Sequence, residues 1–473
     1  MGPPRVESGG FWVWSRNVGD VSGAPGQKSS EMVGNRPVPP GTPRRRPWRA
    51  HARGLALDLS PLRARDFRLL WTGEIFSEIG SNITLVAVLL QVDALTHDPA
   101  AVGLIGLVQL VPLIAASLFG GAWIDRFDRR RLLLVAQIGQ AGAAAVLLAG
   151  AFLGSTPLWL VYVGAGLVAG LSGFSLATRS AMTPSLVPAD RLPSALALNQ
   201  VMWNTAQIVG PALGGLIVGG LGYRWAYGID VASFAGTIGA ALLMAPHRPV
   251  VADPDDEVLG SWRRLGEGFR YVRSKRVLQA TFFIDLIAMV FGMPRVLFPL
   301  LARTRFGAGP ELAGLLFASV SVGAVIAALT SGWVHRVNRQ GCAIVTAVIV
   351  WGLAIAGFGL VGGHVLVALL LLAIAGGADV ISAVFRSTIL QASVPDALRG
   401  RLSGIHISVV AGGPRLGDLE GGVVASMTSP AVSVVSGGIL CVVGAVVLAW
   451  RMPAFARYRT GEPTGSSAGN APS

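Results

Sequence analysis

The sequence between residues 67 and 451 is a nearly continuous series of apolar runs. Each run approaches the ~20 residues that a helix needs to cross a bilayer. Only 13% of the residues are charged, against about 25% in soluble domains. Because helices satisfy their own backbone hydrogen bonds in hydrocarbon, the fold class is an all-α membrane protein. We predict twelve transmembrane helices, over residues 67–92, 100–124, 131–154, 157–178, 195–219, 223–245, 277–301, 310–334, 342–361, 364–386, 401–427 and 430–451.

Positive charges gather in alternate loops. The loops after the even-numbered spans hold most of the Lys and Arg residues between spans, whereas the other loops hold only Arg224, Arg303 and Arg305. Loops rich in Lys and Arg stay on the cytoplasmic side, so we expect both termini in the cytoplasm. The net charge of +13 therefore sets topology, and we expect no nucleic-acid partner.

Five segments follow from the spans. We predict a disordered basic cytoplasmic tail over 1–62, a six-helix half over 63–245, a cytoplasmic linker over 246–276, a second six-helix half over 277–452 and a disordered cytoplasmic tail over 453–473. Residues 259–276 of the linker have apolar residues at helical spacing with arginines between them, which predicts an amphipathic helix on the inner membrane face. The first tail is either solvated or touches anionic lipid.

The two halves repeat each other. Three short motifs recur at offsets of 203 to 210 positions: 121–129 with 331–339, Arg179-Ser180 with Arg386-Ser387, and 210–216 with 413–419. Each half has an even number of spans, so both halves have the same orientation. We expect pseudo-symmetry about an axis along the membrane normal, with a binding cavity between the halves.

The loop after the second span has a pattern of spaced Gly, Asp and Arg residues. It contains the predicted gating residues Gly121, Asp125, Arg126, Arg129 and Arg130. An ordinary cytoplasmic turn explains the arginines but not the spacing of the Gly and Asp. The pattern resembles the same loop of major facilitator superfamily transporters, which implies that Asp125 and Arg129 lock an inner gate near residues 400–401.

The second half carries a weaker version of that loop, with Gly332, Arg336 and Arg339 as predicted gating residues. Here His335 replaces the Asp. In the first loop, Asp128 stands where the superfamily has Gly.

Several charged residues lie within the apolar runs. An ionised group at mid-membrane costs about 2.5–3.5 kcal/mol on insertion scales, so these groups must face a cavity, pair or bind protons. The candidates for proton or substrate coupling are Glu74, Glu78, Asp285, Asp379, Asp418 and Glu420, and those for substrate attraction are Arg295 and Arg415. A rim position for Glu74, a structural pair of Arg415 with Asp418, and snorkelling of Arg295 are the alternatives.

The fifth span contains Gly210, Pro211, Gly214 and Gly215. The proline removes one hydrogen bond and the glycines remove bulk, which favours a bendable, closely packed helix. This G-P-x-x-G-G sequence resembles the signature of facilitator exporters that exchange drug for proton.

The closest resemblance, over residues ~65–450, is to the enterobactin exporter family within the superfamily. It rests on six sets of residues: 295–299, 314–318, 323–324, 328–332, and the pairs Gly400-Arg401 and Gly417-Asp418. The resemblance implies twelve helices in the inner (cytoplasmic) membrane and proton-driven export of a small molecule such as a siderophore or drug. Glu74 and Glu78 are outside the family pattern. The fourth span, 157–178, lacks the Arg that many proton antiporters use.

We therefore predict a secondary exporter that works by alternating access and exchanges its substrate for protons. Its partners would be a small amphipathic molecule, protons and membrane lipids, and it would act as a monomer. A proton-coupled importer and a non-transporting membrane sensor or scaffold are the alternatives. We expect no enzymatic activity and no cofactor, because the sequence has no Walker A motif and its two cysteines lack zinc-site spacing.

Overall fold

The computed structural model describes residues 58–153, 156–246, 270–393 and 396–459, without the side chains of 117–122, 125, 335, 391–408, 410 and 411. The predicted amphipathic helix over 259–276 lies mostly outside these ranges. The described residues belong to one compact unit of the chain.

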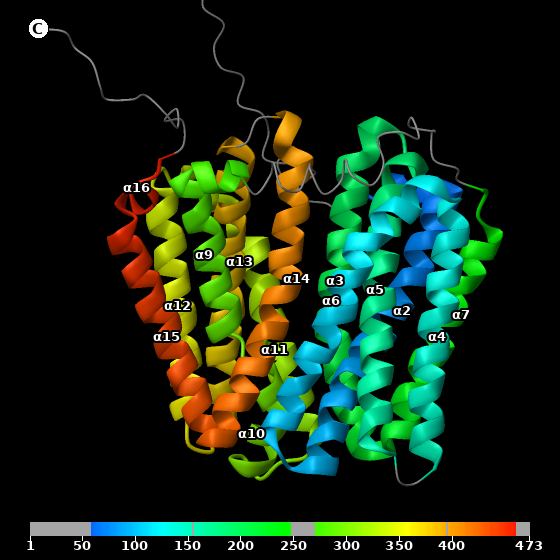
Figure 1. Ribbon diagram of the computed structural model, residues 1–473, viewed down its shortest axis with the longest axis horizontal. Coiled ribbons are helices and arrows are strands. Elements are labelled where there is room, and N and C mark those ends of the chain that lie inside the picture. Colours follow the sequence, from blue (N-terminus) through cyan, green and yellow to red (C-terminus); the bar gives the residue numbers. More distant parts are fainter. Residues whose placement is uncertain (1–57, 154–155, 247–269, 394–395, 460–473) are drawn as a thin grey trace, which may run out of the picture. The chain divides into compact units, whose positions relative to one another are not determined.

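The first half of this body contains six long helices (Figure 1). A short 3-10 turn, η1 (Ser60–Arg63), precedes the first of them, and η2 (Ala189–Arg191) precedes the fifth. The long helices are α2 (Arg65–Thr96), α3 (Pro99–Arg126), α4 (Arg129–Phe152), α5 (Leu158–Leu186), α6 (Leu192–Leu221) and α7 (Tyr223–Leu243).

The second half has six corresponding segments, the first of which is broken. That segment comprises α9 (Arg276–Phe291), η4 (Arg295–Leu297) and α10 (Phe298–Thr304). It is followed by α11 (Pro310–Thr330), η5 (Ser331–Arg336), α12 (Gln340–Leu360), α13 (Val365–Ser393), α14 (Asp396–Met427), α15 (Pro430–Arg451) and the short α16 (Pro453–Ala456).

Eleven helical segments of the described chain are long and apolar enough to cross a membrane. The twelfth, α14, has 32 residues and contains Arg415, Asp418 and Glu420. It packs against α3, α9 and α15, among the other long helices. The twelve-helix prediction is therefore confirmed.

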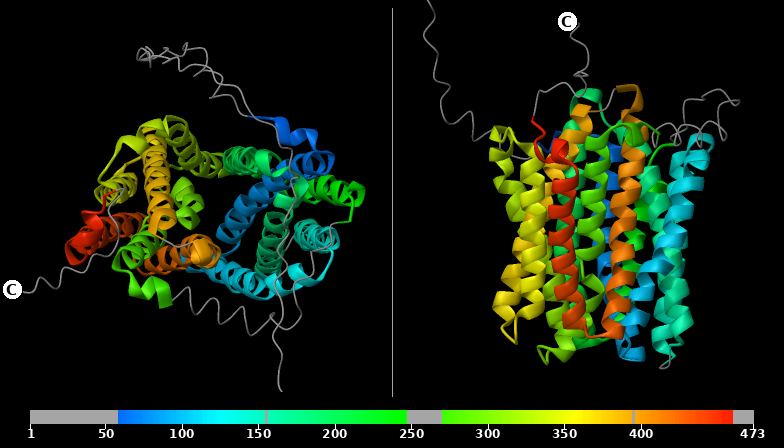
Figure 2. Two further views of the ribbon diagram at one scale, coloured as in Figure 1. Left: turned by 90° about the horizontal axis from the view of Figure 1, so that it is seen from above. Right: turned by 60° about the vertical axis from the view of Figure 1, so that its left-hand side comes forward.

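The helix contacts follow the internal repeat. Within the first half α3 packs on α5 and α4 on α5 and α7, and within the second half α11 packs on α13 and α12 on α13 and α15. Two extensive contacts join the halves, α6 with α11 and α3 with α14. Each contact joins the fifth helix of one half to the second helix of the other half, so the two contacts are equivalent. Figure 2 shows the paired halves from above.

The helix ends define two faces. We call the face at which α2, α4, α6, α9 and α12 begin the basic face, because Arg65, Arg129, Arg191, Arg276 and Arg339 lie there. The end of α7 lies at this face too, since the Ala245 amide donates to Asp66 at 3.3 Å. The other end of the bundle, where α2 and α10 end, is the opposite face.

Glycines let the backbones of the two halves touch near the opposite face. A Cβ atom on Gly215 of α6 would lie 2.8 Å from the Cα of Gly314 in α11, and one on Gly103 of α3 would lie 2.8 Å from the Cα of Gly422 in α14. Contacts that close exclude any side chain larger than hydrogen. The two contacts are equivalent, since Gly103 and Gly314 lie near the starts of the second spans and Gly215 and Gly422 near the ends of the fifth spans.

The seventh span is interrupted rather than continuous. The helix α9 ends at Phe291, and Gly292, Met293 and Pro294 separate it from η4. Proline has no amide hydrogen to continue the ladder. The buried Trp351 indole compensates by donating to the carbonyl of Gly292 at 2.8 Å.

The C-terminal boundary differs from the prediction. We expected disorder from residue 453, but α16 follows α15 and packs on α9 and α12. Phe455 is fully buried there, and the carbonyl of Tyr458 accepts from the Gly341 amide. The apolar Phe455 anchors a segment that composition alone assigned to the tail.

We predict that Gly215→Ala lowers the free energy of unfolding by about 1–3 kcal/mol, the usual range for overpacking. The added methyl group meets backbone atoms of α11, which cannot rotate away. Gly220→Ala, in the same helix with open space around it, is the control and should be neutral or slightly stabilising. Reversible unfolding of the purified protein in SDS measures both, and equal effects would contradict the glycine contact.

Candidate functional site

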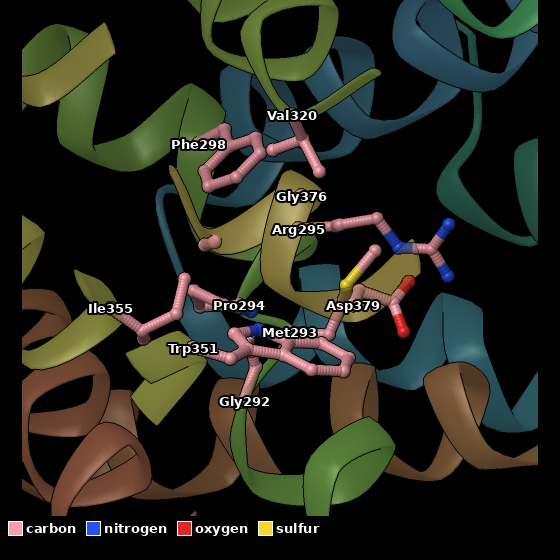
Figure 3. Close-up of a pocket in the computed structure, with 11 residues that line it drawn as sticks. Gly292, Met293, Pro294, Arg295, Phe298, Val320, Trp351, Ile355, Gly376 and Asp379 are labelled. Carbon is pink, nitrogen blue, oxygen red and sulfur yellow. Dashed lines mark hydrogen bonds between the residues drawn. The ribbon is translucent and has the colours of Figure 1, made fainter. Parts of the chain in front are cut away.

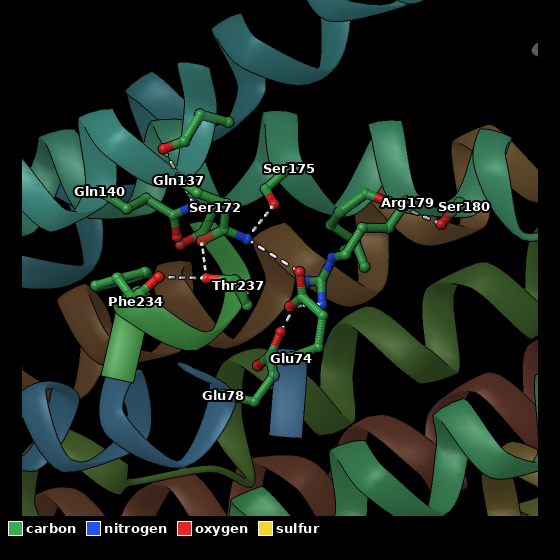
Figure 4. Close-up of polar contacts among 12 residues, drawn as sticks. Glu74, Glu78, Gln137, Gln140, Ser172, Ser175, Arg179, Ser180, Phe234 and Thr237 are labelled. Carbon is green, nitrogen blue, oxygen red and sulfur yellow. Dashed lines mark hydrogen bonds and ion pairs between the residues drawn. The ribbon is translucent and has the colours of Figure 1, made fainter. Parts of the chain in front are cut away.

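An arginine and two glutamates form a buried cluster in the first half. Arg179 of α5 bonds Glu74 of α2 through Nη1, and its Nη2 lies 2.8 Å from Oε1 of Glu78, one turn further along α2. The three side chains are 15%, 3% and 20% exposed. Two carboxylates thus share one guanidinium, as Figure 4 shows.

This cluster corrects our interpretation of the fourth span. We ended that span at residue 178 and inferred that it lacks an arginine, but α5 continues to Leu186 and includes Arg179. The apolar run ends early because the helix carries a charge whose partners lie on α2. A paired guanidinium is compatible with helix positions that the hydropathy pattern excludes.

Polar side chains from α4 and α7 hold the cluster in place. The Gln137 amide of α4 donates to Oε1 of Glu74 at 3.0 Å and to the Ser175 hydroxyl at 3.3 Å. Thr237 of α7 donates to the Gln137 oxygen at 3.2 Å. These hydrogen bonds connect four helices inside the first half, and they fix the orientation of Glu74 (Figure 4).

The second half contains an equivalent cluster. Arg386 of α13 places Nη2 3.0 Å from Oδ1 of Asp285 in α9 and 3.6 Å from Oδ1 of Asp379 in α13. Its Nη1 donates to Ser382 at 2.8 Å. Arg386 and Asp285 are almost completely buried, at 2% and 1% exposed.

The internal repeat relates the two clusters. Asp285 follows Glu74 by 211 positions, the spacing between the starts of α3 and α11. Arg386 follows Arg179 by 207 positions, the spacing between the starts of α5 and α13. Each half therefore pairs an acid on its first span with an arginine on its fourth.

Further charges of the second half lie beside its cluster. Arg295, in η4, lines a pocket together with Asp379, Trp351 and Met293. Figure 3 shows the Arg295 guanidinium and the Asp379 carboxylate extending to the same side of this pocket.

Asp418 of α14 interacts electrostatically with both Arg295 and Arg415. Together with the Arg386 cluster they make three arginines and three aspartates, whose formal charges balance. Glu420, which is partly exposed, is separate from this group.

One ion pair joins the two halves near the opposite face. Arg303 of α10 reaches Asp93 of α2 through Nη2 at 2.9 Å and through Nε at 3.2 Å. Asp93 is buried, whereas Arg303 is 46% exposed. This fork is the bidentate geometry that arginine favours with carboxylates.

Comparison with known proteins supports the fold and the sequence resemblance. A family model described as transmembrane secretion effector matches residues 56–461. The chain belongs to this family of the major facilitator superfamily. Its members are transporters, so the protein is not an enzyme.

Relatives of this chain include the enterobactin exporter EntS of Citrobacter koseri and that of Shigella boydii. Each is 29% identical over 396 residues, which cover 83% of this chain and 93% of the exporter. The resemblance stated from the sequence is thus confirmed.

Solved structures show the same fold. A POT family transporter in complex with a thioalcohol conjugated peptide has a TM-score of 0.67 at 12% identity, covering 83% of this chain and 96% of that one. A bacterial homolog of the human lysosomal transporter Spinster, in an inward-facing and unoccupied conformation, has a TM-score of 0.61 at 14% identity, covering 85% and 100%.

The loop arginines of the predicted gate bind helix ends within the first half. Arg129 donates to the carbonyl of Ala181 at 2.8 Å, and Arg130 donates to the carbonyls of Ala241 and Leu242, both at 2.6 Å. Cations are favourable at helix C-termini, where carbonyls lack intrahelical partners.

The other predicted gate residues have fewer described contacts. Arg126 also has an interaction partner. The side chains of Gly121, Asp125 and residues 400–401 lie outside the described set, so the inner gate stays a prediction. In the second half, Gly332, Arg336 and Arg339 are exposed at η5 and the start of α12.

The exporter motif forms two helix contacts at once. Gly210 and Gly214 face α2 at Asn82 and Ile83, and Gly215 faces α11. Pro211 lies within α6, which continues through it as one helix. The small residues therefore bring α6 close to a helix of each half.

Several charged residues of the site were missed or misplaced by sequence reasoning. Arg179 was placed outside the predicted fourth span. Arg386 was the last residue of the predicted tenth span but was not named among the intramembrane charges, and Asp93 was not singled out. The repeat contained a usable signal, because Arg179-Ser180 and Arg386-Ser387 recur at one offset. The ion pair of Asp93 with Arg303 joins residues 210 positions apart, which no local pattern indicates.

We predict that Arg179→Gln lowers the free energy of unfolding by about 3–5 kcal/mol, because it leaves two buried carboxyl groups without their counter-charge. Adding Glu74→Gln to that variant should restore part of the loss. SDS unfolding of the single, double and wild-type proteins measures this coupling.

The control for this series is Arg191→Gln. Arg191 is 36% exposed and its ion-pair atoms lie 4.0 Å from Asp190, so we expect a change within about 0.5 kcal/mol. An Arg179→Gln protein as stable as this control would refute a charge-balancing role for Arg179.

Proposed function

We propose that this protein exports a small, amphipathic, anionic molecule of the siderophore class by alternating access, in exchange for protons. The observation that carries the proposal is the pair of repeat-related acid–arginine clusters, one inside each half. The names of the EntS relatives support the siderophore class and the outward direction.

The substrate would bind between the halves, near the charges that α9, η4, α13 and α14 bring together. Arg295 and Arg415 are only partly buried, and both act on Asp418. An anionic substrate that binds these guanidinium groups would compete with Asp418 for them. This competition couples substrate binding to the charge state of the acids.

The proton would enter and leave through the carboxyl groups of the two clusters. In the first half Glu74 and Glu78 share Arg179, so one carboxyl group is in excess of the available positive charge. Two carboxylates that close do not both ionise readily. Release of a proton would increase the negative charge beside Arg179 and so change the electrostatic field that the first half presents to the second.

Alternating access would use the glycine crossings as the pivot. The crossings at Gly215–Gly314 and Gly103–Gly422 and the ion pair of Asp93 with Arg303 all lie toward the opposite face, which they hold together. In this account the basic face is cytoplasmic, both termini lie in the cytoplasm, and the protein acts as a monomer in contact with membrane lipids.

Transport in everted membrane vesicles tests the proposal. Vesicles from cells that produce the protein should accumulate enterobactin, the molecule named for the EntS relatives, when their lumen is acidified, and vesicles from cells without the protein should not. Accumulation driven only by an alkaline lumen would indicate import. Absence of transport for siderophores and drugs alike would favour a sensor or scaffold.

We predict that Glu78→Gln abolishes siderophore accumulation driven by the proton gradient, because it removes the excess carboxyl group but keeps a hydrogen-bonding side chain at Arg179. Counterflow exchange without a gradient should continue. The matched control is Asp190→Asn, since Asp190 is 77% exposed and lies outside the cluster. Gradient-driven transport by Glu78→Gln at the wild-type rate would contradict this role.

We also predict that Asp93→Asn favours opening at the opposite face. Loss of an ion pair with one partly exposed partner is worth about 1 kcal/mol, or roughly a fivefold change in the populations of the two conformations. Accessibility of a cysteine at Thr304 to a membrane-impermeant maleimide reports the change. Arg305→Gln serves as the control, and exchange of the charges of Asp93 and Arg303 should restore the wild-type accessibility.

A further inference from the structure

A further buried aspartate lies in the first half, outside the ion pairs of both clusters. Asp230 of α7 is fully buried, at 0% exposed, against the glycine and hydroxyl residues of α2. The Thr84 hydroxyl donates to its Oδ2 at 2.6 Å. A Cβ atom on Gly80 would lie 2.8 Å from its Oδ1, so the glycine makes room for the carboxyl group.

Asp230 has no positive counter-charge in the described part of the chain. The ion pairs of this part include those of Arg179, Arg303 and Arg386, and no ion pair involves Asp230. An ionised carboxylate without a partner costs several kcal/mol inside a protein. The charge of Asp230 must therefore be neutralised either by a titratable neighbour or by a proton.

The titratable groups around Asp230 do not supply a neutralising positive charge. The helices packed against α7 are α2, α4 and α6. From α2 the acid Glu78 acts on Asp230, and α7 itself adds Tyr223, Arg224 and Tyr227. Arg224 is exposed and donates to the carbonyl of Ala151. The spanning parts of α4, from Leu132 on, and of α6 contain no titratable residue. The negative charge of Glu78 opposes a second one at Asp230.

The two carboxyl oxygens of Asp230 differ in their hydrogen bonds. Oδ2 accepts from Thr84, whereas Oδ1 is buried without a hydrogen-bond partner. The neighbouring Ser233 hydroxyl already donates its single hydrogen to the main-chain oxygen of Asp230 at 2.7 Å. Ser81 also lies beside the carboxyl group, but Oδ1 has no hydrogen bond from it or from Ser233. With its hydrogen on the main-chain oxygen, Ser233 offers Oδ1 a lone pair, and a hydrogen on Oδ1 would complete this contact.

We infer that Asp230 is a proton-binding site inside the first half, and that in this conformation it carries a proton on Oδ1. The ligand is a proton rather than a metal ion, because the Thr84 hydroxyl donates a hydrogen bond directly to the Asp230 carboxyl oxygen. A metal ion held by both would separate them. The site lies within one half, so the inference is independent of the charges between the halves and of the proposed substrate.

Such a site gives the first half a store of one proton next to the Glu78 carboxyl group. A change in the charge of Glu78 would change the affinity of Asp230 for the proton without any movement of α2 against α7. Because Glu74, Glu78 and Thr84 all lie on α2, the cluster and the Asp230 site are coupled while the first half stays rigid.

Infrared difference spectroscopy of the full-length protein in lipid nanodiscs tests the inference without any substrate. A protonated carboxyl group has a C=O stretching band apart from the carboxylate bands, and this band shifts in D2O. At neutral pH we expect a band that is absent from Asp230→Asn and is separate from any band of the Glu74–Glu78 pair, which remains in that variant. In Thr84→Val the band should remain but shift, because the carbonyl loses its hydrogen-bond donor.

Stability measurements separate this result from a folding defect. Asparagine has the donor and acceptor pattern of a neutral carboxyl group, so Asp230→Asn should unfold at the wild-type SDS concentration. Asp93→Asn, which changes an ion-paired carboxylate on α2, should leave the infrared band in place. A spectrum of Asp230→Asn identical to the wild type would overturn the inference. A wild-type band that disappears when sodium replaces choline in the buffer would also overturn it, since it would show a metal-ion site.

Discussion

The energetic cost of an ionised side chain in hydrocarbon is the constraint on which this structure depends. Each of Arg179 and Arg386 lies on the fourth span of its half and reaches an acid on the first span. Neither charge could stay in its helix alone. The ion pairs therefore do more than neutralise charge, because they require the first and fourth spans of each half to keep a fixed relation.

Polar residues hold the helices together within each half, whereas small residues form the contacts between the halves. Inside each half, hydrogen bonds such as that of Gln137 with Glu74 fix the helices relative to one another. Between the halves, the contacts Gly103–Gly422 and Gly215–Gly314 are made by backbones without side chains. Movement at these crossings breaks few directional bonds, whereas movement within a half would expose buried charge. Rocking of whole halves is the motion that this arrangement permits at least cost.

The sequence predicted the parts of the fold that follow from apolar length and charge distribution. Twelve spans, two halves and the family could be inferred because runs of ~20 apolar residues have one explanation in a bilayer. The break at Gly292–Pro294 could not be placed by length alone, since the flanking residues are as apolar as those of an unbroken helix.

The missed charges share a physical reason. Arg179 and Asp230 lie in helices whose polarity is acceptable only because of partners on α2, more than 100 positions away. Hydropathy counts each residue without its partner, so it assigns such an arginine to a loop and overlooks such an aspartate. The repeat was a better guide, because a spacing of 207 positions relates Arg179 to Arg386 and a spacing of 211 relates Gly103 to Gly314.

The central claim is that two rigid halves, each held by its own buried ion pairs, pivot about the glycine crossings. Distances between spin labels on the two halves test it most directly. One label pair would be placed at Arg131 and Arg339 on the basic face, and another at Leu95 and Thr304 on the opposite face. On addition of transported substrate, the account predicts that one distance shortens while the other lengthens. Two distances that change together, or a change between labels within one half, would contradict it.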